Sequence, residues 1–195
     1  SKLESDEVVL EEIPFNLSNI SKEIFVVIEQ IAAEENIRIV WEKEEITHWN
    51  LIGSPEYVKR IMMNILSNAV KYNKENGYIY ISYQEFTSEQ EGRVTIEFIC
   101  RDTGIGMTKD FHTGSRTKFS GTGLGMPITK KLIEKMGGTI TFESKKGEGT
   151  TFVIRIPFKI DQDADQREEQ EAISEKSIKD LKILLVEDNE LNMEI

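Results

Sequence analysis

The stretch Asn64-Ile65-Leu66-Ser67-Asn68-Ala69-Val70-Lys71-Tyr72 decides the fold of this chain, together with two glycine turns downstream of it. The first turn reads Asp102-Thr103-Gly104-Ile105-Gly106, and the second reads Gly121-Thr122-Gly123-Leu124-Gly125. The polar helix offers oxygen ligands for a hard metal ion, the first turn offers an acceptor for adenine, and the second offers a seat for phosphates. No single element decides much, but all three in this order make ATP binding the first hypothesis.

The polar residues of the quoted helix share one side. Successive helical residues rotate by about 100°, so Asn64, Asn68, Lys71 and Tyr72 fall within one sector of roughly 100° that borders the apolar stripe. Carboxamide oxygens suit magnesium, which keeps several waters and completes its shell with phosphate oxygens. Lys71 can add positive charge to the same phosphates. An ordinary amphipathic helix would show the same pattern, so the helix alone leaves both interpretations open.

The first glycine turn follows a strand that ends at Asp102. A carboxylate held by a sheet can accept a hydrogen bond from an exocyclic amine, which adenine has and guanine replaces with a carbonyl. We expect Gly104 and Gly106 to let the backbone approach a flat ring without a Cβ clash. A tight acidic turn without a ligand is the alternative.

The second glycine turn runs straight into a helix. The backbone amides at the start of a helix point outward, and the helix dipole adds partial positive charge, so such a turn can bind an anion. No Gly-Lys-Ser/Thr follows, which excludes a Walker loop, and the strand–turn–helix context of a dinucleotide fingerprint is missing. The residues expected to line the phosphates are Gly121, Thr122, Gly123, Leu124 and Gly125.

Periodicity along the chain predicts the α+β class, with a two-layer α/β sandwich. We expect a mixed, mostly antiparallel sheet with the helices on one face, because hairpins outnumber strand–helix–strand crossovers. We expect Asn16 or Ser18 to cap the first helix and Ser54 to cap the second, and the third helix to begin at Pro127. The expected strands cover residues 37–41, 49–52, 78–83, 94–98, 139–144 and 150–158.

Composition excludes several classes of function. The net charge of −11 argues against nonspecific nucleic-acid binding, which needs basic groups. The sequence contains no run of about 18 apolar residues, so no membrane span is predicted. Residues 1–6 lack the basic and then apolar form of a signal peptide. The single Cys100 cannot form an intramolecular disulfide, which fits a reducing compartment such as the cytoplasm. Basic residues nevertheless cluster around the glycine turns, and such an island in an acidic chain suggests a small anionic ligand.

The three motifs resemble the N, G1 and G2 boxes of sensor histidine kinases, over about residues 10–158. This is their catalytic and ATP-binding domain, with the Bergerat fold that gyrase, Hsp90 and MutL share. The resemblance implies that the cofactors are ATP and Mg²⁺ and that Asn68, with Asn64, holds the metal. It further implies that Lys71 contacts phosphate, Tyr72 lines the nucleotide site and Asp102 reads the adenine amine.

The resemblance also implies roles for residues near the base and in the lid. Thr150 or Thr151 corresponds to a hydroxyl that supports an adenine-bound water, and Met107 and Leu124 flank the base. The segment 108–120 is shorter than the usual ATP lid; a natural trimming, an engineered deletion and missing residues all remain open. Candidate contacts to the terminal phosphate there are Arg116 and Lys118, so the candidate catalytic residues are Asn68, Lys71, Arg116 and Lys118.

The domain organisation implied is that of a hybrid kinase. Residues 1–12 would end a dimerisation hairpin, 13–158 would form the catalytic domain, 159–179 an acidic linker, and 180–195 the start of a receiver domain with Glu187 and Asp188 as its paired acids. The implied enzyme transfers the ATP γ-phosphate to a histidine on a separate dimerisation domain and then to a receiver Asp. We expect a homodimer in the full protein, a cytoplasmic location and no membrane contact by this stretch; a membrane anchor elsewhere stays open.

Two other functions are consistent with the same fold. A nucleotide-regulated binding module would hold ATP and change its affinity for a partner without phosphotransfer. An ATPase of the Hsp90 or MutL kind needs a Glu as general base on the asparagine helix, where this chain has Asn64 and Ser67. Neither His48 nor His112 lies in a phospho-acceptor motif, so the accepting histidine is expected on another domain.

Overall fold

The structure is a computed structural model, and it describes residues 9–106, 125–164, 166 and 167. The chain divides into two units, residues 1–161 and 162–195. In the second unit the described residues include a short helical stretch in which the Arg167 amide donates to the Asp163 carbonyl at 3.1 Å. The predicted receiver strand and most of the second glycine turn lie outside the described residues.

The described residues of the first unit form one sheet and three helices. Its elements, in chain order, are β1 (Ile13–Asn16), α1 (Leu17–Glu34), β2 (Arg38–Glu45), β3 (Asn50–Gly53), α2 (Pro55–Lys71), β4 (Tyr78–Thr87), β5 (Arg93–Asp102), α3 (Gly125–Lys135), β6 (Thr139–Lys145) and β7 (Gly149–Ile160). The 7-stranded sheet has the order β1-β3-β7-β5-β4-β2, with β6 beside β7. Only β2 and β4, among the described strands, pair in parallel.

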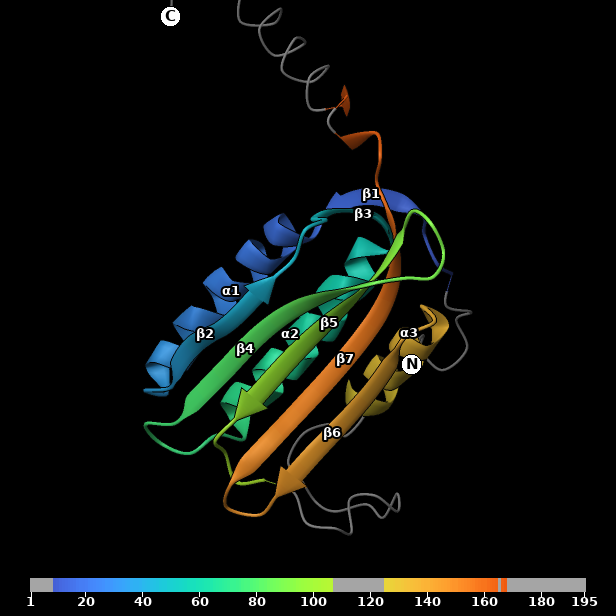
Figure 1. Ribbon diagram of the computed structural model, residues 1–195. Coiled ribbons are helices and arrows are strands. Elements are labelled where there is room, and N and C mark those ends of the chain that lie inside the picture. The colour runs from blue at the N-terminus through green and yellow to red at the C-terminus, as the bar shows by residue number, and fades with distance from the viewer. Residues whose placement is uncertain (1–8, 107–124, 165, 168–195) are drawn as a thin grey trace, which may run out of the picture. The chain divides into compact units, whose positions relative to one another are not determined.

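The helices lie on one face of the sheet, behind it in the view of Figure 1. This arrangement confirms the predicted two-layer sandwich with a mostly antiparallel sheet. Alternation within the strands directs every second side chain toward the helices, as Ile79, Ile81 and Tyr83 show by being at most 1% exposed. The stripe of α2, including Ile65 and Leu66, covers them from the helical layer.

One polar group in the core links three elements. The Tyr83 hydroxyl on β4 lies 3.0 Å from Ser21 Oγ on α1 and donates to Met62 Sδ on α2 at 3.6 Å. Burial raises the pKa of Tyr83, and the hydrogen bond with Ser21 opposes that shift. The neutral phenol therefore keeps its proton, and its hydrogen bonds satisfy a group that would otherwise be costly to bury.

Helix α1 is capped by Asn16, the first of the two residues proposed for that role, and it buries only part of its apolar residues. Asn16 accepts a hydrogen bond from the Asn19 amide at 3.1 Å, as an N-cap side chain does. Val27 and Ile31 share the apolar spacing of this helix, yet they are 44% and 39% exposed because the contact face centres on Ile24 and Ile28. Within the part of the chain that is described, no helix combines the length and apolar character needed to cross a membrane.

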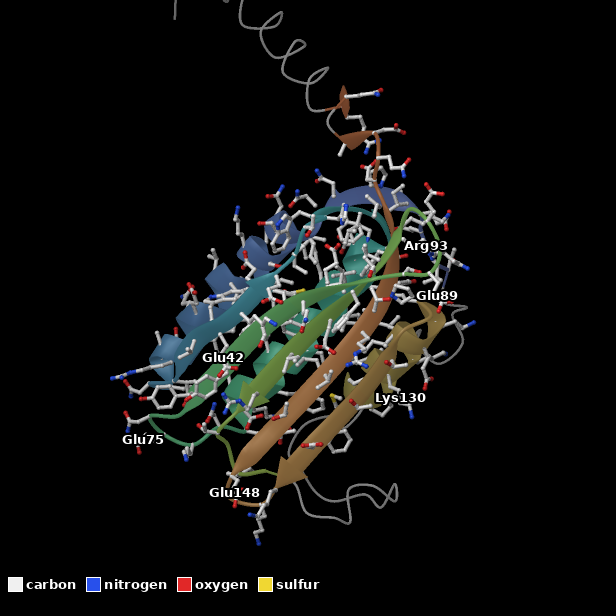
Figure 2. The ribbon with its side chains drawn as sticks, viewed as in Figure 1. Glu42, Glu75, Glu89, Arg93, Lys130 and Glu148 are labelled. Atoms are coloured by element: carbon white, nitrogen blue, oxygen red, sulfur yellow. The ribbon has the colours of Figure 1, made fainter. Side chains whose placement is uncertain are left out.

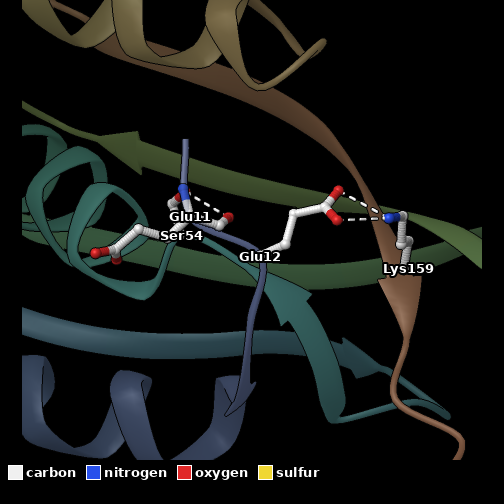
Figure 3. Close-up of polar contacts among 4 residues, drawn as sticks. All are labelled: Glu11, Glu12, Ser54 and Lys159. Atoms are coloured by element: carbon white, nitrogen blue, oxygen red, sulfur yellow. Dashed lines mark hydrogen bonds and ion pairs between the residues drawn. The ribbon is translucent and has the colours of Figure 1, made fainter. Parts of the chain in front are cut away.

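Ser54 occupies the predicted N-cap position of α2, but its side chain does not cap the helix. Its hydroxyl makes no hydrogen bond to the helix; it donates to the Glu11 carbonyl at 2.9 Å and accepts from the Glu11 amide at 2.7 Å (Figure 3). Next to it, Lys159 Nζ lies 2.8 Å from both carboxylate oxygens of Glu12. We term these contacts of Glu11 and Glu12 the entry clasp. They hold residues 11 and 12 against the start of α2 and the end of β7. They lie next to the β1–β3 pairing, which the sequence did not predict.

Candidate nucleotide-binding site

Asp102 ends β5 and is 7% exposed, facing the helical layer. Its Oδ1 accepts hydrogen bonds from the Gly104 amide at 2.8 Å and the Thr150 amide at 3.2 Å. Among the described residues, none donates to its Oδ2. Burial raises the pKa of Asp102, while the two amide hydrogen bonds oppose the shift. The carboxylate is thus held by one oxygen, and the other remains available as an acceptor.

The glycines of the first turn pack against protein backbone. A Cβ at Gly104 would overlap the Tyr72 carbonyl oxygen, and one at Gly106 would overlap the Lys145 carbonyl oxygen. Gly106 also has φ +63°, a conformation that other residues rarely adopt. The expected reason for these glycines, close approach to a flat ring, is therefore replaced by close approach to the end of α2 and to the β6–β7 hairpin.

A polar network that the sequence did not reveal ties this turn to α2 and β4. The Ile105 amide donates to the Tyr72 carbonyl at 3.0 Å. Thr103 Oγ1 accepts from the Tyr78 amide at 2.9 Å and donates to Asn73 Oδ1 at 3.2 Å. Asn73 Nδ2 in turn donates to the Tyr78 carbonyl at 3.1 Å. The position of Asp102 is therefore fixed relative to the C-terminal end of α2.

Thr150, rather than Thr151, lies beside Asp102. The Thr150 amide bonds the carboxylate, its hydroxyl lies 2.9 Å from Ser144 Oγ, and the residue is 7% exposed. Thr151 pairs with Arg101 in the sheet, and successive strand residues point to opposite faces. The structure thus places the Thr150 side chain with Asp102 and the Thr151 side chain on the open face.

Helix α2 carries the predicted amide and lysine side chains near its C-terminal end. Asn68 is half-buried, and its side chain makes no hydrogen bond to any other described residue. Lys71 Nζ lies 5.1 Å from the centroid of the Tyr72 ring. Because the Tyr72 carbonyl also contacts Gly104 and Ile105, the structure brings this end of α2 against the turn that carries Asp102.

Asn64 lies one helical turn earlier and contacts α3. Its Nδ2 donates to Thr129 Oγ1 at 2.8 Å and to Met126 Sδ at 3.6 Å. Its Oδ1 would lie 2.6 Å from a Cβ at Gly125, the first residue of α3. The sequence named Asn64 and Gly125 as site residues but gave no sign that Thr129 links them.

The remaining predicted site residues lie outside the described residues. They are Met107, Arg116, Lys118, Gly121, Thr122, Gly123 and Leu124. The described part of the site therefore consists of two groups, which we define here. The base-side group is Asp102, Gly104, Gly106 and Thr150, and the metal-side group is Asn64, Asn68, Lys71, Gly125 and Thr129.

This arrangement has a counterpart among known families. A family model described as "Histidine kinase-, DNA gyrase B-, and HSP90-like ATPase" matches residues 53–160. The matched range exceeds half of the 195 residues and contains α2, Asp102 and α3. The chain belongs to this ATPase family. The resemblance to the ATPase domain of sensor histidine kinases is thereby confirmed.

Curated relatives of this ATPase domain are sensor kinases. Sensor histidine kinase GacS of Pseudomonas protegens is 34% identical over 167 residues, which cover 80% of this chain and 18% of GacS. The histidine-protein kinase BarA of Escherichia coli is 32% identical over 167 residues, with the same coverages of 80% and 18%. The chain is homologous to these ATP-dependent protein-histidine kinases and spans 18% of their length.

Solved structures of the family share the fold. The catalytic domain of histidine kinase ThkA superimposes with a TM-score of 0.60 at 26% identity, covering 75% of this chain and 95% of that domain. Full-length ShkA in complex with AMPPNP gives a TM-score of 0.66 at 23% identity, covering 82% of this chain and 34% of that protein. The described sheet and helices are therefore those of a histidine-kinase ATPase domain.

The donor atoms of the site fit ATP and magnesium chemically. An acceptor oxygen at Asp102, left without a donor among the described residues, matches the exocyclic amine of adenine. The oxygens of Asn68 and Asn64 are hard, neutral ligands of the kind that magnesium accepts beside phosphate. A bound magnesium ion would neutralise phosphate charge, and Lys71 can supply a further positive charge near the same position.

Proposed function

We propose that this chain is the ATP-binding catalytic domain of a two-component sensor histidine kinase of the hybrid type. It binds ATP with Mg²⁺ and positions the γ-phosphate for attack by a histidine on a separate dimerisation domain. From that histidine the phosphoryl group passes to a receiver Asp. The family and the sensor-kinase relatives support this function, and the metal, the partners and the residue roles are our proposals.

The observation that carries the proposal is the half-satisfied carboxylate of Asp102. Two backbone amides hold Oδ1 at 2.8 Å and 3.2 Å, and none of the described residues donates to Oδ2, which leaves that oxygen as an acceptor for a base. A carboxylate oxygen without a protein donor gains a hydrogen bond when a ligand supplies a donor. The adenine amine supplies one, whereas the guanine carbonyl at the same place repels the carboxylate, which gives the site its preference for ATP.

The phosphate end of the site depends on α2. Asn68 and Asn64 hold magnesium through their amide oxygens, and Lys71 adds positive charge to the phosphates. Arg116 and Lys118 contribute to the terminal phosphate, and the amides of the second glycine turn bind the others. No side chain of this domain forms a covalent intermediate; its contribution is placement and charge stabilisation.

The rest of the protein follows the same proposal. Residues 1–12 end a dimerisation hairpin, 13–158 are the catalytic domain, 159–179 link it onward, and 180–195 begin a receiver domain in which Glu187 and Asp188 bind magnesium. ThkA has been seen in complex with the response regulator protein TrrA, which supports a receiver as partner. We place the domain in the cytoplasm, within a homodimeric protein.

Nucleotide binding and phosphotransfer test the proposal separately. Calorimetric titration should give clear ATP binding that magnesium strengthens, with GTP weaker by at least about tenfold, the factor that one unpaired hydrogen-bonding group costs. Adding the histidine-bearing hairpin in trans with labelled ATP should then label that histidine. Equal binding of ATP and GTP would refute the role of Asp102. ATP binding without label on the histidine would favour a nucleotide-regulated binding module.

A further inference from the structure

The contact between α2 and α3 runs through one carboxamide. Asn64 Nδ2 donates to Thr129 Oγ1 at 2.8 Å, and Thr129 is 1% exposed. Asn64 and Thr129 are 65 residues apart in the chain, so the contact exists only in the folded domain. Met126 Sδ, at 3.6 Å, is a second and weaker acceptor for the same nitrogen.

The opposite side of this carboxamide faces the first residue of α3. A Cβ at Gly125 would lie 2.6 Å from Asn64 Oδ1 and 3.5 Å from Nδ2. The absence of a side chain at Gly125 thus leaves room for the oxygen at the start of the helix. The two ends of the carboxamide consequently have different surroundings, with hydrogen-bond acceptors at the nitrogen and the α3 terminus at the oxygen.

The two ends of a carboxamide differ in chemistry although they are nearly equal in shape. The oxygen can coordinate a divalent cation, whereas the NH₂ group cannot and would direct positive hydrogens at it. A rotation of the group by 180° therefore converts a metal ligand into a group that repels the metal. The residue that holds the nitrogen decides which end is available.

We propose that Thr129 is a positioning residue that fixes the rotation of the Asn64 carboxamide. Its hydroxyl holds the nitrogen, so the oxygen is directed to the start of α3, where it serves magnesium-dependent nucleotide binding. This inference rests on the proposed function, because it needs a cation at the metal-side group. Thr129 itself touches neither the metal nor the nucleotide.

The variant that tests this role is Thr129→Val, which keeps the shape and removes the acceptor. We expect the affinity for a non-hydrolysable ATP analogue in magnesium to fall about fivefold, the factor that one ordinary hydrogen bond carries. Affinity in the presence of a chelator should stay within about twofold, because base recognition at Asp102 is unaffected. Thr129→Ser, which retains the hydroxyl, should restore the magnesium effect, and Thr141→Val on exposed β6 is the matched control.

The ratio of the affinities with magnesium and with chelator separates positioning from a loss of packing. A packing defect lowers both affinities and the melting temperature together, leaving the ratio unchanged. An unchanged ratio in Thr129→Val would overturn the positioning role while leaving the proposed function intact. A wild-type chain whose ATP binding ignores magnesium would contradict the metal site and the inference together.

A measurement on the wild-type chain covers the case in which Thr129→Val does not fold. The side-chain amide group of Asn64, observed by ¹⁵N relaxation without nucleotide, should be as rigid as the backbone of α2. The exposed Asn19 side chain provides a comparison of expected high mobility. Free motion of the Asn64 amide group on the nanosecond timescale would exclude a fixed rotation.

Discussion

The base-side and metal-side groups are held by different kinds of contact. Around Asp102 the contacts come from backbone atoms: two amides on the carboxylate, and the carbonyls of Tyr72 and Lys145 against the glycines. Around Asn64 they come from the side chains of Thr129 and Met126, which can rotate. The comparison teaches that the proposed base recognition rests on the path of the backbone, whereas the proposed metal binding depends on side-chain orientation and is easier to tune.

The largest effect should follow from Gly106→Ala. The new Cβ would overlap the Lys145 carbonyl at a backbone conformation of φ +63°, and such strain and overlap together cost about 2–4 kcal/mol of unfolding free energy. Urea denaturation measures this loss, and nucleotide affinity should fall with it.

A second glycine provides the matched control for that substitution. Gly147 has φ +82°, but a Cβ there would meet nothing within 4 Å. Gly147→Ala should therefore show backbone strain alone, about 1 kcal/mol. If the two variants lose equal stability, the overlap at Gly106 has no energetic weight and the base-side group is less rigid than described.

The next largest effect concerns Asp102→Asn. The amide oxygen can still accept from Gly104 and Thr150, so the fold should survive, but an NH₂ group replaces Oδ2. We expect ATP affinity to fall about a hundredfold, since a donor now faces the adenine amine. Competition titrations with ATP and GTP measure the change. A variant that still prefers ATP as strongly as the wild type would show that another residue reads the base.

Asn68→Ala should have a smaller effect, confined to magnesium. Loss of one neutral oxygen ligand should weaken magnesium-dependent nucleotide binding about tenfold, in the range seen when a metal site is perturbed. Binding in chelator should be unchanged, because Asp102 keeps its contacts. A parallel loss in both conditions would mean that Asn68 supports the structure and not the metal.

The smallest expected effect is a dependence of stability on pH at Asp102. Burial raises the pKa of this carboxyl above its ordinary value, so the folded chain takes up a proton more readily than the unfolded chain. The cost of burying the charge is therefore full above the folded pKa and disappears as the pH falls below the unfolded value.

Melting curves of Asp102→Asn and of the wild type, taken across acidic to neutral pH, measure this contribution. The variant has no charge to bury, so its stability relative to the wild type should be greatest near neutral pH and should shrink on acidification. A gap that grows on acidification would mean that the pKa is lowered, and that the amide hydrogen bonds outweigh burial.

The sequence predicted most of the sheet and helices because their signals are local. The stripe of α2, the alternation in β4 and β5, and the cap at Asn16 all involve neighbours in the chain. The motif residues Asp102 and Asn68 were recognisable because their spacing is typical of a family. These signals need no knowledge of which elements touch.

What the sequence could not predict involves contacts between distant residues. Ser54 is the predicted N-cap residue, yet its hydroxyl bonds to Glu11, which lies 43 residues away in the chain. Thr129 gave no signal because Asn64, its partner, belongs to another helix, and β1 is too short and contains Pro14, so no strand pattern emerges. Val27 and Ile31 fit the apolar period of α1, but the period does not say where the packed face ends.

The entry clasp has a consequence for how neighbouring domains could act on this one. The N-terminal strand β1 pairs with β3, and so does the C-terminal end of β7. Just after β7, the Asp161 amide donates to the Asn50 carbonyl at 3.0 Å. The N-terminal and C-terminal connections of the domain therefore lie at the same end of the sheet. Arg93 marks that end and Glu148 the opposite one (Figure 2). Asp102 lies at the far end of β5, about 30 Å away at the rise of an antiparallel strand. A neighbouring domain attached through either connection would therefore act on the proposed base-side carboxylate along the full length of β5 and β7.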